Sequence, residues 1–200
     1  MDQQERALIA IASRILSYPD ETFDKDKKEI SNIIAENISS KQLMNELEEI
    51  FIPLYGLTLQ EIQELYVATF DLKSKLGLYL TAHELGDSSK RGAALIKLQK
   101  MVNEAGFERV EGELADYIPM LLEFLAVSPA DNDHTRLQRR LAVAFQRMLN
   151  NIPENNPYAP FLLVLMRHVF PEPTKEEVEK LEFEREEADL EELPYPIMYQ

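Results

Sequence analysis

The hydrophobic residues of this 200-residue chain recur at intervals of three and four, the spacing of one face of an α-helix. Such stripes run through residues 8–16, 30–38, 43–51, 62–70, 94–105, 114–125, 137–148 and 161–169. Alternating β-branched runs are scarce and the chain has only 6 Gly, which argues against a β-rich fold. The pattern predicts an all-α, single-domain helical bundle of roughly eight or nine helices.

Local signals predict where some of these helices begin and end. The sequence "TLQE", Thr58–Glu61, is a capping box, in which the Thr hydroxyl and the Glu carboxylate satisfy backbone amides at a helix start. The apolar stripe that begins at Leu43 runs up to Pro53, where we expect the helix that carries it to end. From Leu76 to Leu85 apolar residues occur on nearly every side, which predicts a central, buried helix.

The last thirty residues differ from the rest in charge and in pattern. Residues 171–200 hold eleven acids and three bases, a balance of −8 out of a net charge of −15. Their apolar stripe is thin, although Thr174–Glu177 form a weak capping box. We therefore expect an all-α domain over 1–170 and an acidic tail over 171–200, partly ordered or docked. The apolar end Leu193–Gln200 would either occupy a peptide-binding groove of the same chain or cover another apolar patch, and we expect the second, a structural docking contact.

Charge and composition exclude several classes of function. A chain with 36 acidic and 21 basic residues would repel nucleic acid and anionic membranes, and it would attract a basic peptide. The absence of Cys removes disulfides and thiolate chemistry. The longest apolar run, Phe161–Met166, is too short to cross a bilayer, and the N-terminus lacks the pattern of a secretory signal. We expect a cytoplasmic protein.

Chemically versatile residues crowd into "LYLTAHELGDSSKRGAAL", Leu78–Leu95. Gly86 and Gly92 do not have the spacing of a phosphate-binding loop. His83 and Asp87 could share a helical face, but no second His lies nearby to complete a metal site. A Ser–His–acid triad is not excluded by spacing, yet the strand–turn–helix elbow that presents such a nucleophile is absent from the pattern.

A corner between two packed helices accounts for the same stretch more economically. Gly86 would end the first helix with a positive φ, which Gly adopts without strain. Asp87 or Ser88 would cap the next helix, and Gly92 would let another helix approach closely. His83 would then be a buried, hydrogen-bonded residue, so we expect no resident metal or cofactor.

The amino-acid sequence of this corner resembles that of a known protein family. The segment "YVATFDLKSKLGLYLTAHELGDSSKRGAAL", Tyr66–Leu95, is similar to the NarJ family, the nitrate reductase delta-subunit-type molybdenum cofactor assembly chaperones of the wider TorD/DmsD-like group. A second segment, "GELADYIPMLLEFLA", Gly112–Ala126, resembles the family's E-L-P-D-H-L-P-x-x-L-E-F stretch. It has Ala115 where the family usually has Pro, and Tyr117 where it usually has His.

This resemblance implies an all-α, cytoplasmic chaperone with no enzymatic activity. Such proteins bind the N-terminal segment of the apo catalytic subunit of respiratory nitrate reductase. They hold that subunit competent until molybdenum cofactor is inserted, and they prevent early docking on the membrane anchor. Two alternatives stay open: a maturation chaperone for another molybdoenzyme, and an all-α enzyme with an unrecognised site.

The resemblance also implies which residues contact the peptide. In the wider group, two segments are associated with the binding face, and they correspond here to Tyr66, Phe70, Glu113, Asp116, Tyr117 and Pro119. The motif residues His83, Gly86, Asp87, Arg91 and Gly92 are expected to have structural roles. Because Tyr117 replaces the usual His, we expect peptide binding to change little between about pH 6 and 8, the range in which a His titrates.

Each binding residue has a purely structural interpretation as well. Tyr66 and Phe70, four apart, could be ordinary core contacts. Glu113 and Asp116 would lie in the first turn of their helix, where the helix dipole favours acids. Arg91 could simply pair with a nearby acid.

Overall fold

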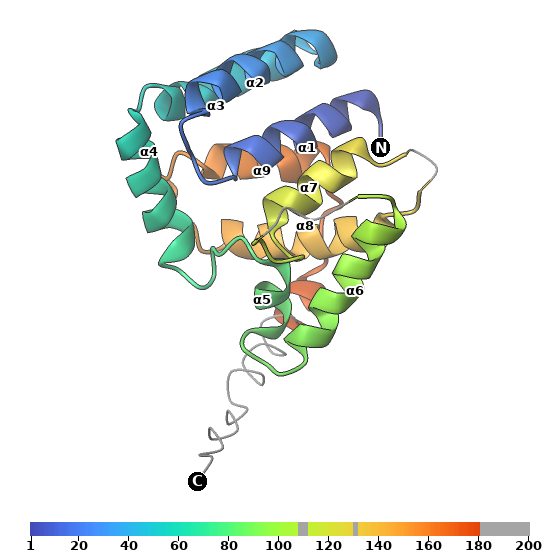
Figure 1. Ribbon diagram of the computed structural model, residues 1–200. Coiled ribbons are helices and arrows are strands. Elements are labelled where there is room, and N and C mark those ends of the chain that lie inside the picture. Colours follow the sequence, from blue (N-terminus) through green and yellow to red (C-terminus); the bar gives the residue numbers. More distant parts are fainter. Residues whose placement is uncertain (108–111, 130–131, 181–200) are drawn as a thin grey trace.

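The computed structural model describes residues 1–107, 112–129 and 132–180, and its regular structure there is helical (Figure 1). The helices are α1 (Gln3–Ile15), α2 (Phe23–Asn37), α3 (Lys41–Tyr55), α4 (Leu59–Tyr66), α5 (Leu80–Leu85), α6 (Arg91–Glu104), α7 (Ile118–Val127), α8 (Thr135–Leu149) and α9 (Ala159–His168). A π-helical turn, η1 (Val67–Asp71), continues α4. The predicted all-α fold of roughly eight or nine helices is confirmed for the described residues.

Helix α1 occupies the centre of the bundle. It packs mainly along α7 and also contacts α2 and α9. Leu8, Ile9, Ile11 and Ala12 of α1 are completely buried, as its apolar spacing predicts. Figure 1 shows α2 and α3 together above α1, with α8, α5 and α6 on the opposite side. Burial of this many aliphatic side chains supplies the main free energy of folding.

Local sequence signals predict the start of α4 correctly and the end of α3 incorrectly. The capping box is present: the Glu61 amide donates to Thr58 Oγ1 (3.3 Å), and the Thr58 amide donates to Glu61 Oε2 (2.8 Å). The predicted end of α3 at Pro53 is wrong, because the helix continues to Tyr55. Proline removes only one backbone donor there, and the Gly56 amide still closes the last turn on the Ile52 carbonyl (3.0 Å).

The predicted helix from Leu76 to Leu85 is wrong in its first half. Leu76 and Leu78 are buried as expected, but helix α5 begins only at Leu80. The backbone before it pairs with the segment before α7. The Ile118 amide donates to the Leu78 carbonyl (2.8 Å), and the Leu80 amide donates to the Asp116 carbonyl (2.9 Å). This two-bond bridge replaces the helical hydrogen bonds of the segment.

The same bridge changes the interpretation of the two motif acids. Helix α7 begins at Ile118, so Glu113 and Asp116 precede it and do not lie in its first turn. The dipole explanation for these acids is therefore wrong.

Residues 171–180 of the acidic segment return to the bundle. The capping box at Thr174 forms, with the Glu177 amide donating to Thr174 Oγ1 (3.3 Å), and residues 175–180 are helical. Arg139 of α8 donates two hydrogen bonds to the Glu177 carboxylate (2.6 and 2.8 Å). The docking contact expected for Leu193–Gln200 lies outside the described residues, and the division at residue 170 stays a prediction.

Candidate functional site

A groove of about 430 Å³ lies where four of the six predicted binding residues meet. Tyr66 and Phe70 contribute from α4 and η1, and Glu113 and Tyr117 contribute from the segment before α7. Its complete lining is Tyr18, Tyr66, Phe70, Asp71, Lys73, Ser74, Gly77, Leu78, Tyr79, Ala82, Gly86, Asp87, Glu113 and Tyr117. Residues far apart in sequence thus form one surface, which a single helix pattern cannot reveal.

Aromatic rings make up much of the groove wall. Tyr66 contacts Tyr18 edge-on at 5.3 Å between ring centroids and Phe70 at 5.1 Å. Tyr79 and Tyr117 lie 5.6 Å apart. The irregular π turn places the Phe70 ring beside that of Tyr66, and the Leu72 amide closes the turn on the Val67 carbonyl (3.2 Å). Such turns occur often at functional sites.

Hydroxyl groups give this apolar wall a polar layer. The Tyr66 hydroxyl donates to the Leu16 carbonyl (3.2 Å) and shares a hydrogen bond with the Tyr117 hydroxyl (3.2 Å). The Tyr79 hydroxyl donates to Glu113 Oε1 (3.1 Å). Burial and the Glu113 charge raise the pKa of Tyr79 to about 12, and burial also raises the pKa of Tyr66 and Tyr117. All three phenols therefore remain protonated at neutral pH.

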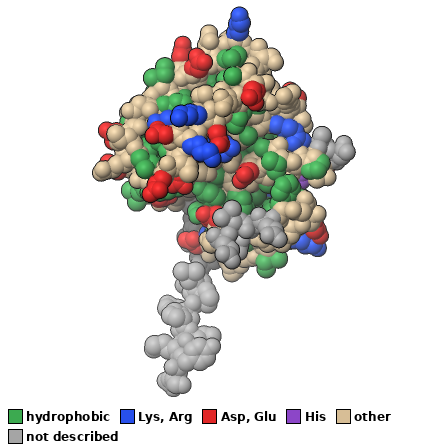
Figure 2. All heavy atoms as spheres, turned by 45° about the horizontal axis from the view of Figure 1, so that its top comes forward, with side chains coloured by type: hydrophobic (Ala, Val, Ile, Leu, Met, Phe, Trp, Pro, Cys, Tyr) green, Lys and Arg blue, Asp and Glu red, His purple; other side chains and the backbone are tan. Residues whose placement is uncertain are grey.

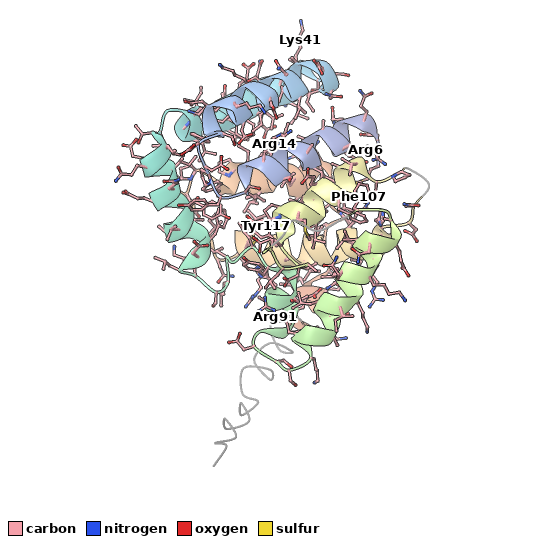
Figure 3. All side chains as sticks on the ribbon, viewed as in Figure 1. Arg6, Arg14, Lys41, Arg91, Phe107 and Tyr117 are labelled. Carbon is pink, nitrogen blue, oxygen red and sulfur yellow. The ribbon has the colours of Figure 1, made fainter. Side chains whose placement is uncertain are left out.

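Asp116 and Pro119, also predicted to bind peptide, do not line the groove. Asp116 is completely buried and accepts hydrogen bonds from the Thr81 amide (3.1 Å) and the Thr81 hydroxyl. Arg91 of α6 reaches the same carboxylate oxygen at 3.4 Å, which confirms the expected pairing with an acid. Figure 3 shows Arg91 below Tyr117, at the start of α6. Pro119 is buried in the first turn of α7. The structure gives Asp116 the role of joining α5, α6 and the segment before α7.

His83 is buried, as expected, and both of its ring nitrogens have partners. It is 1% exposed, its Nε2 lies 2.6 Å from the Gly77 carbonyl, and its Nδ1 lies 3.3 Å from Arg147. The Gly77 carbonyl is an acceptor, so Nε2 carries the proton in this contact. Among the described residues, no three His, Cys, Asp or Glu side chains are close enough together to hold a metal ion.

The glycines and Asp87 of the corner give a mixed outcome. Gly86 ends α5 with φ of 52°, as predicted for a position that favours glycine. Asp87 is exposed and does not cap α6, whose N-cap is Lys90. Gly92 is exposed, and a Cβ there would meet no atom within 4 Å, so the expected close helix approach is wrong.

Sequence reasoning missed two aromatic residues of the groove. Tyr18 follows α1 and is 50% exposed, and Tyr79 forms the bridge with Tyr117. The signal for Tyr18 was its position directly before Pro19, which favours an extended backbone over a helix. Tyr79 lies in the segment that resembles the family, but it was not assigned to binding. The predicted insensitivity to pH at Tyr117 stays a prediction.

Among the helices of the described residues, none has the length and apolar content needed to span a membrane. The described residues thus form a helical bundle with the aromatic groove on its surface. The chain is similar in structure to a protein from Archaeoglobus fulgidus named as a redox enzyme maturation protein, with a TM-score of 0.59 and 20% identity. The match covers 81% of this chain and 91% of the other, which shows a shared fold.

The family follows from the sequence comparison. Residues 39–156 match the model of the nitrate reductase delta subunit family, and the chain belongs to this family. It is 30% identical over 155 residues to a Bacillus subtilis protein named as the probable nitrate reductase molybdenum cofactor assembly chaperone NarJ, covering 77% of this chain and 83% of that one. It is 33% identical over 125 residues to the NarJ chaperone of Escherichia coli K12, covering 60% of this chain and about half (52%) of that one.

Proposed function

We propose that this protein is a dedicated assembly chaperone for respiratory nitrate reductase and acts in the cytoplasm. Its membership of the nitrate reductase delta subunit family supports this, as do relatives named as molybdenum cofactor assembly chaperones. In this proposal the protein binds the N-terminal segment of the apo catalytic subunit. It holds that subunit for molybdenum cofactor insertion before the subunit docks on its membrane anchor. It performs no covalent chemistry itself.

The aromatic groove carries this proposal. Tyr18 and Tyr79 offer rigid aromatic surfaces of the kind that bind apolar anchors of a peptide helix, whereas Tyr66 is buried behind them, 4% exposed, as the core interpretation expects. Asp71, Asp87 and Glu113 also line the groove, and Lys73 is the one cation among its described lining residues. This distribution suits a segment with apolar residues on one face and basic residues beside them.

The expected affinity is moderate. Each well-buried anchor contributes ~1.5–3 kcal/mol of transfer free energy, and the ordering of a flexible peptide offsets part of this gain. Moderate affinity suits a partner that has to be released once its cofactor is in place. The partly exposed groove permits that release without unfolding of the bundle.

Calorimetric titration tests the proposal directly. The purified full chain is titrated with a synthetic peptide spanning the N-terminal segment of the nitrate reductase catalytic subunit from the same organism. We expect Tyr79→Ala, which removes a ring that lines only the groove, to weaken binding by about tenfold. The matched control is Ile52→Ala on α3, which removes an exposed apolar side chain (67%) outside the groove.

Two results would contradict the groove as the binding site. The wild-type chain could fail to bind the peptide, or Ile52→Ala could weaken binding as much as Tyr79→Ala. A pull-down from cells grown anaerobically with nitrate addresses the client itself. Recovery of another molybdoenzyme in place of the nitrate reductase catalytic subunit would favour the alternative maturation role.

A further inference from the structure

A hollow of about 640 Å³ lies between α5, α6, α8 and the helical residues 175–180. Helix α5 borders both this hollow and the aromatic groove, because Glu84 and Leu85 line the hollow and Ala82 lines the groove. In Figure 1 residues 171–180, at the red end of the colour bar, lie beside these helices. The hollow is thus a second surface, which shares α5 with the groove.

The lining of the hollow has the opposite charge to the protein as a whole. The chain has 36 acidic and 21 basic residues, whereas the lining contains six basic residues and two acidic residues. The six bases are Lys90, Lys97, Arg136, Arg139, Arg140 and Lys180, and we call this surface the basic hollow. Mutual repulsion of so many cations is unfavourable, so the surface favours a facing anionic group.

Some of these cations already have a carboxylate partner and others do not. Arg140 donates to both oxygens of Glu84 (2.5 and 2.6 Å), which compensates its charge. Lys97 and Arg136 are exposed, and neither has an ion pair within the described part of the chain. At least these two cations can therefore receive a further carboxylate.

The acidic end of the chain contacts the basic hollow at one point. Glu177 accepts two hydrogen bonds from Arg139 (2.6 and 2.8 Å) and one from the Thr174 amide (2.8 Å), so its carboxylate is held against α8. The helical residues continue to Lys180, which also lines the hollow. The chain beyond Lys180 therefore starts at the edge of the basic hollow.

The sequence beyond Lys180 has the charge that the basic hollow lacks. Residues 181–192, "LEFEREEADLEE", contain seven acidic residues and one basic residue, and they lie outside the described residues. We infer that this acidic segment docks in the basic hollow, where it extends the contact of Glu177 with Arg139 and excludes other anions. The inference is independent of the proposed client, because it concerns two parts of the same chain.

The covalent link and the length of the acidic segment support this contact. Twelve residues reach roughly 18 Å as a helix and about 40 Å when extended, and the first of them directly follows a residue of the hollow. A segment tethered so closely has an effective concentration on the order of millimolar. Exposed ion pairs are individually weak, but several of them with one tethered segment add up.

Other occupants fit the basic hollow less well. A basic peptide segment would be repelled by its six cations. A separate acidic protein or a phosphate-bearing ligand would meet the same cations, but it would have to displace a segment that is covalently attached at the edge. The acidic segment thus acts as an internal competitor, and this competition makes the inference testable.

The first experiment locates the acidic segment in the full chain. Because the protein contains no Cys, Ala188→Cys provides a single site for a nitroxide spin label within the segment. At low ionic strength we expect the label to broaden the NMR amide signals of Ala93, Lys97 and Val143, which line the basic hollow. Amide signals of α2 and α3, on the opposite side of the bundle, should keep their intensity (Figure 1). Absence of broadening around the hollow would overturn the inference.

Charge reversal tests whether the contact depends on the cations of the hollow. In the labelled chain, Lys97→Glu/Arg136→Glu should remove the broadening, because carboxylates in the hollow repel the acidic segment. The matched control is Lys28→Glu/Lys41→Glu, which changes the net charge equally at exposed positions of α2 and α3. Figure 3 shows Lys41 at the top of the bundle, far from Arg91 at the start of α6. Equal loss of broadening in both variants would overturn the inference, because net charge alone would then explain the contact.

A small anion tests the proposed exclusion. Calorimetric titration with tripolyphosphate compares the wild-type chain with a segment variant that has lost four charges through Glu182→Gln, Glu184→Gln, Glu186→Gln and Glu187→Gln. We expect the segment variant to bind tripolyphosphate about tenfold more tightly, because its segment no longer competes for the basic hollow. The matched control neutralises four exposed acids elsewhere, Glu36, Glu48, Glu49 and Glu154, and should bind like the wild type.

The outcomes of this titration are decisive in both directions. Adding Lys97→Gln/Arg136→Gln to the segment variant should cancel its gain in affinity, which would assign the bound anion to the basic hollow. Equal affinity of the wild type and the segment variant, including absence of binding to both, would overturn the inference. An equal gain in the matched control, or a gain that persists without Lys97 and Arg136, would overturn it as well. Neither experiment uses the client peptide, so failure of this inference leaves the proposed chaperone function standing.

Discussion

At the scale of single residues, two acids that both lie in the family's sequence motifs have different roles. Asp116 is completely buried and holds the amide and hydroxyl of Thr81 together with Arg91. Asp87 is exposed on the rim of the groove. The sequence analysis expected Asp87 to cap a helix, and it assigned Asp116 to peptide binding with a place in a helix first turn as the structural alternative. The local pattern contains no information on which acid meets a buried donor from another part of the chain.

This difference predicts unequal effects on stability. Asp116→Ala should lower the free energy of unfolding by about 3 kcal/mol, because it leaves the buried Thr81 donors unpaired. Asp87→Ala should change it by no more than about 0.5 kcal/mol, as expected for an exposed residue. Urea unfolding followed by circular dichroism measures both. Similar losses in the two variants would show that Asp116 does not join these segments as described.

At the scale of elements, periodicity predicts helices well and misses contacts between distant segments. The capping box at Thr58 and the stripe of α1 depend on neighbours within a few residues, and both are confirmed. The stretch from Leu76 to Tyr79 is as apolar as a buried helix, but the Leu78 carbonyl accepts its hydrogen bond from the amide of Ile118, far along the chain. A period of 3.6 cannot detect such a bridge. The groove depends on this bridge, so its outline could not be predicted, although four of its residues were named.

The contact between α8 and residues 175–180 gives a prediction on the same scale. Hydrogen bonds from Arg139 and from the Thr174 amide lower the pKa of Glu177 from 4.5 to about 2. Because the folded pKa lies below the ordinary value, this contact stabilises the docked helix fully above about pH 4.5, and its contribution is lost as the pH falls toward 2.

NMR titration of the Glu177 carboxyl group measures the effect directly. We expect a midpoint near 2 in the wild type and a midpoint closer to 4.5 in Arg139→Gln. Arg167→Gln is the control, because Arg167 pairs with Glu46 at a different place on the surface (2.8 Å). An unchanged midpoint in Arg139→Gln would show that the helix does not dock on α8 through this pair.

At the scale of the whole molecule, the net charge of −15 is the property that can be read from the sequence without any structure. On the face displayed in Figure 2, basic and hydrophobic side chains lie among the acids. The structure shows where acidic residues lie relative to the proposed binding surface. Acids outnumber bases in the lining of the groove, where Asp71, Asp87 and Glu113 accompany Lys73, so long-range attraction and the short-range binding surface favour the same basic partner.

This agreement predicts how salt acts on the kinetics of peptide binding. Raising the ionic strength from about 20 to 500 mM shortens the Debye length from roughly 20 Å to below 5 Å, which screens the attraction between separated charges. The association rate of the N-terminal peptide should fall by about tenfold, while the dissociation rate, set by packing on Tyr18 and Tyr79, should change much less. Stopped-flow fluorescence with a labelled peptide gives both rates. A peptide with its basic residues replaced by Gln is the control and should associate slowly at every salt concentration. An association rate of the native peptide that ignores salt would mean that the acidic surface does not steer its partner.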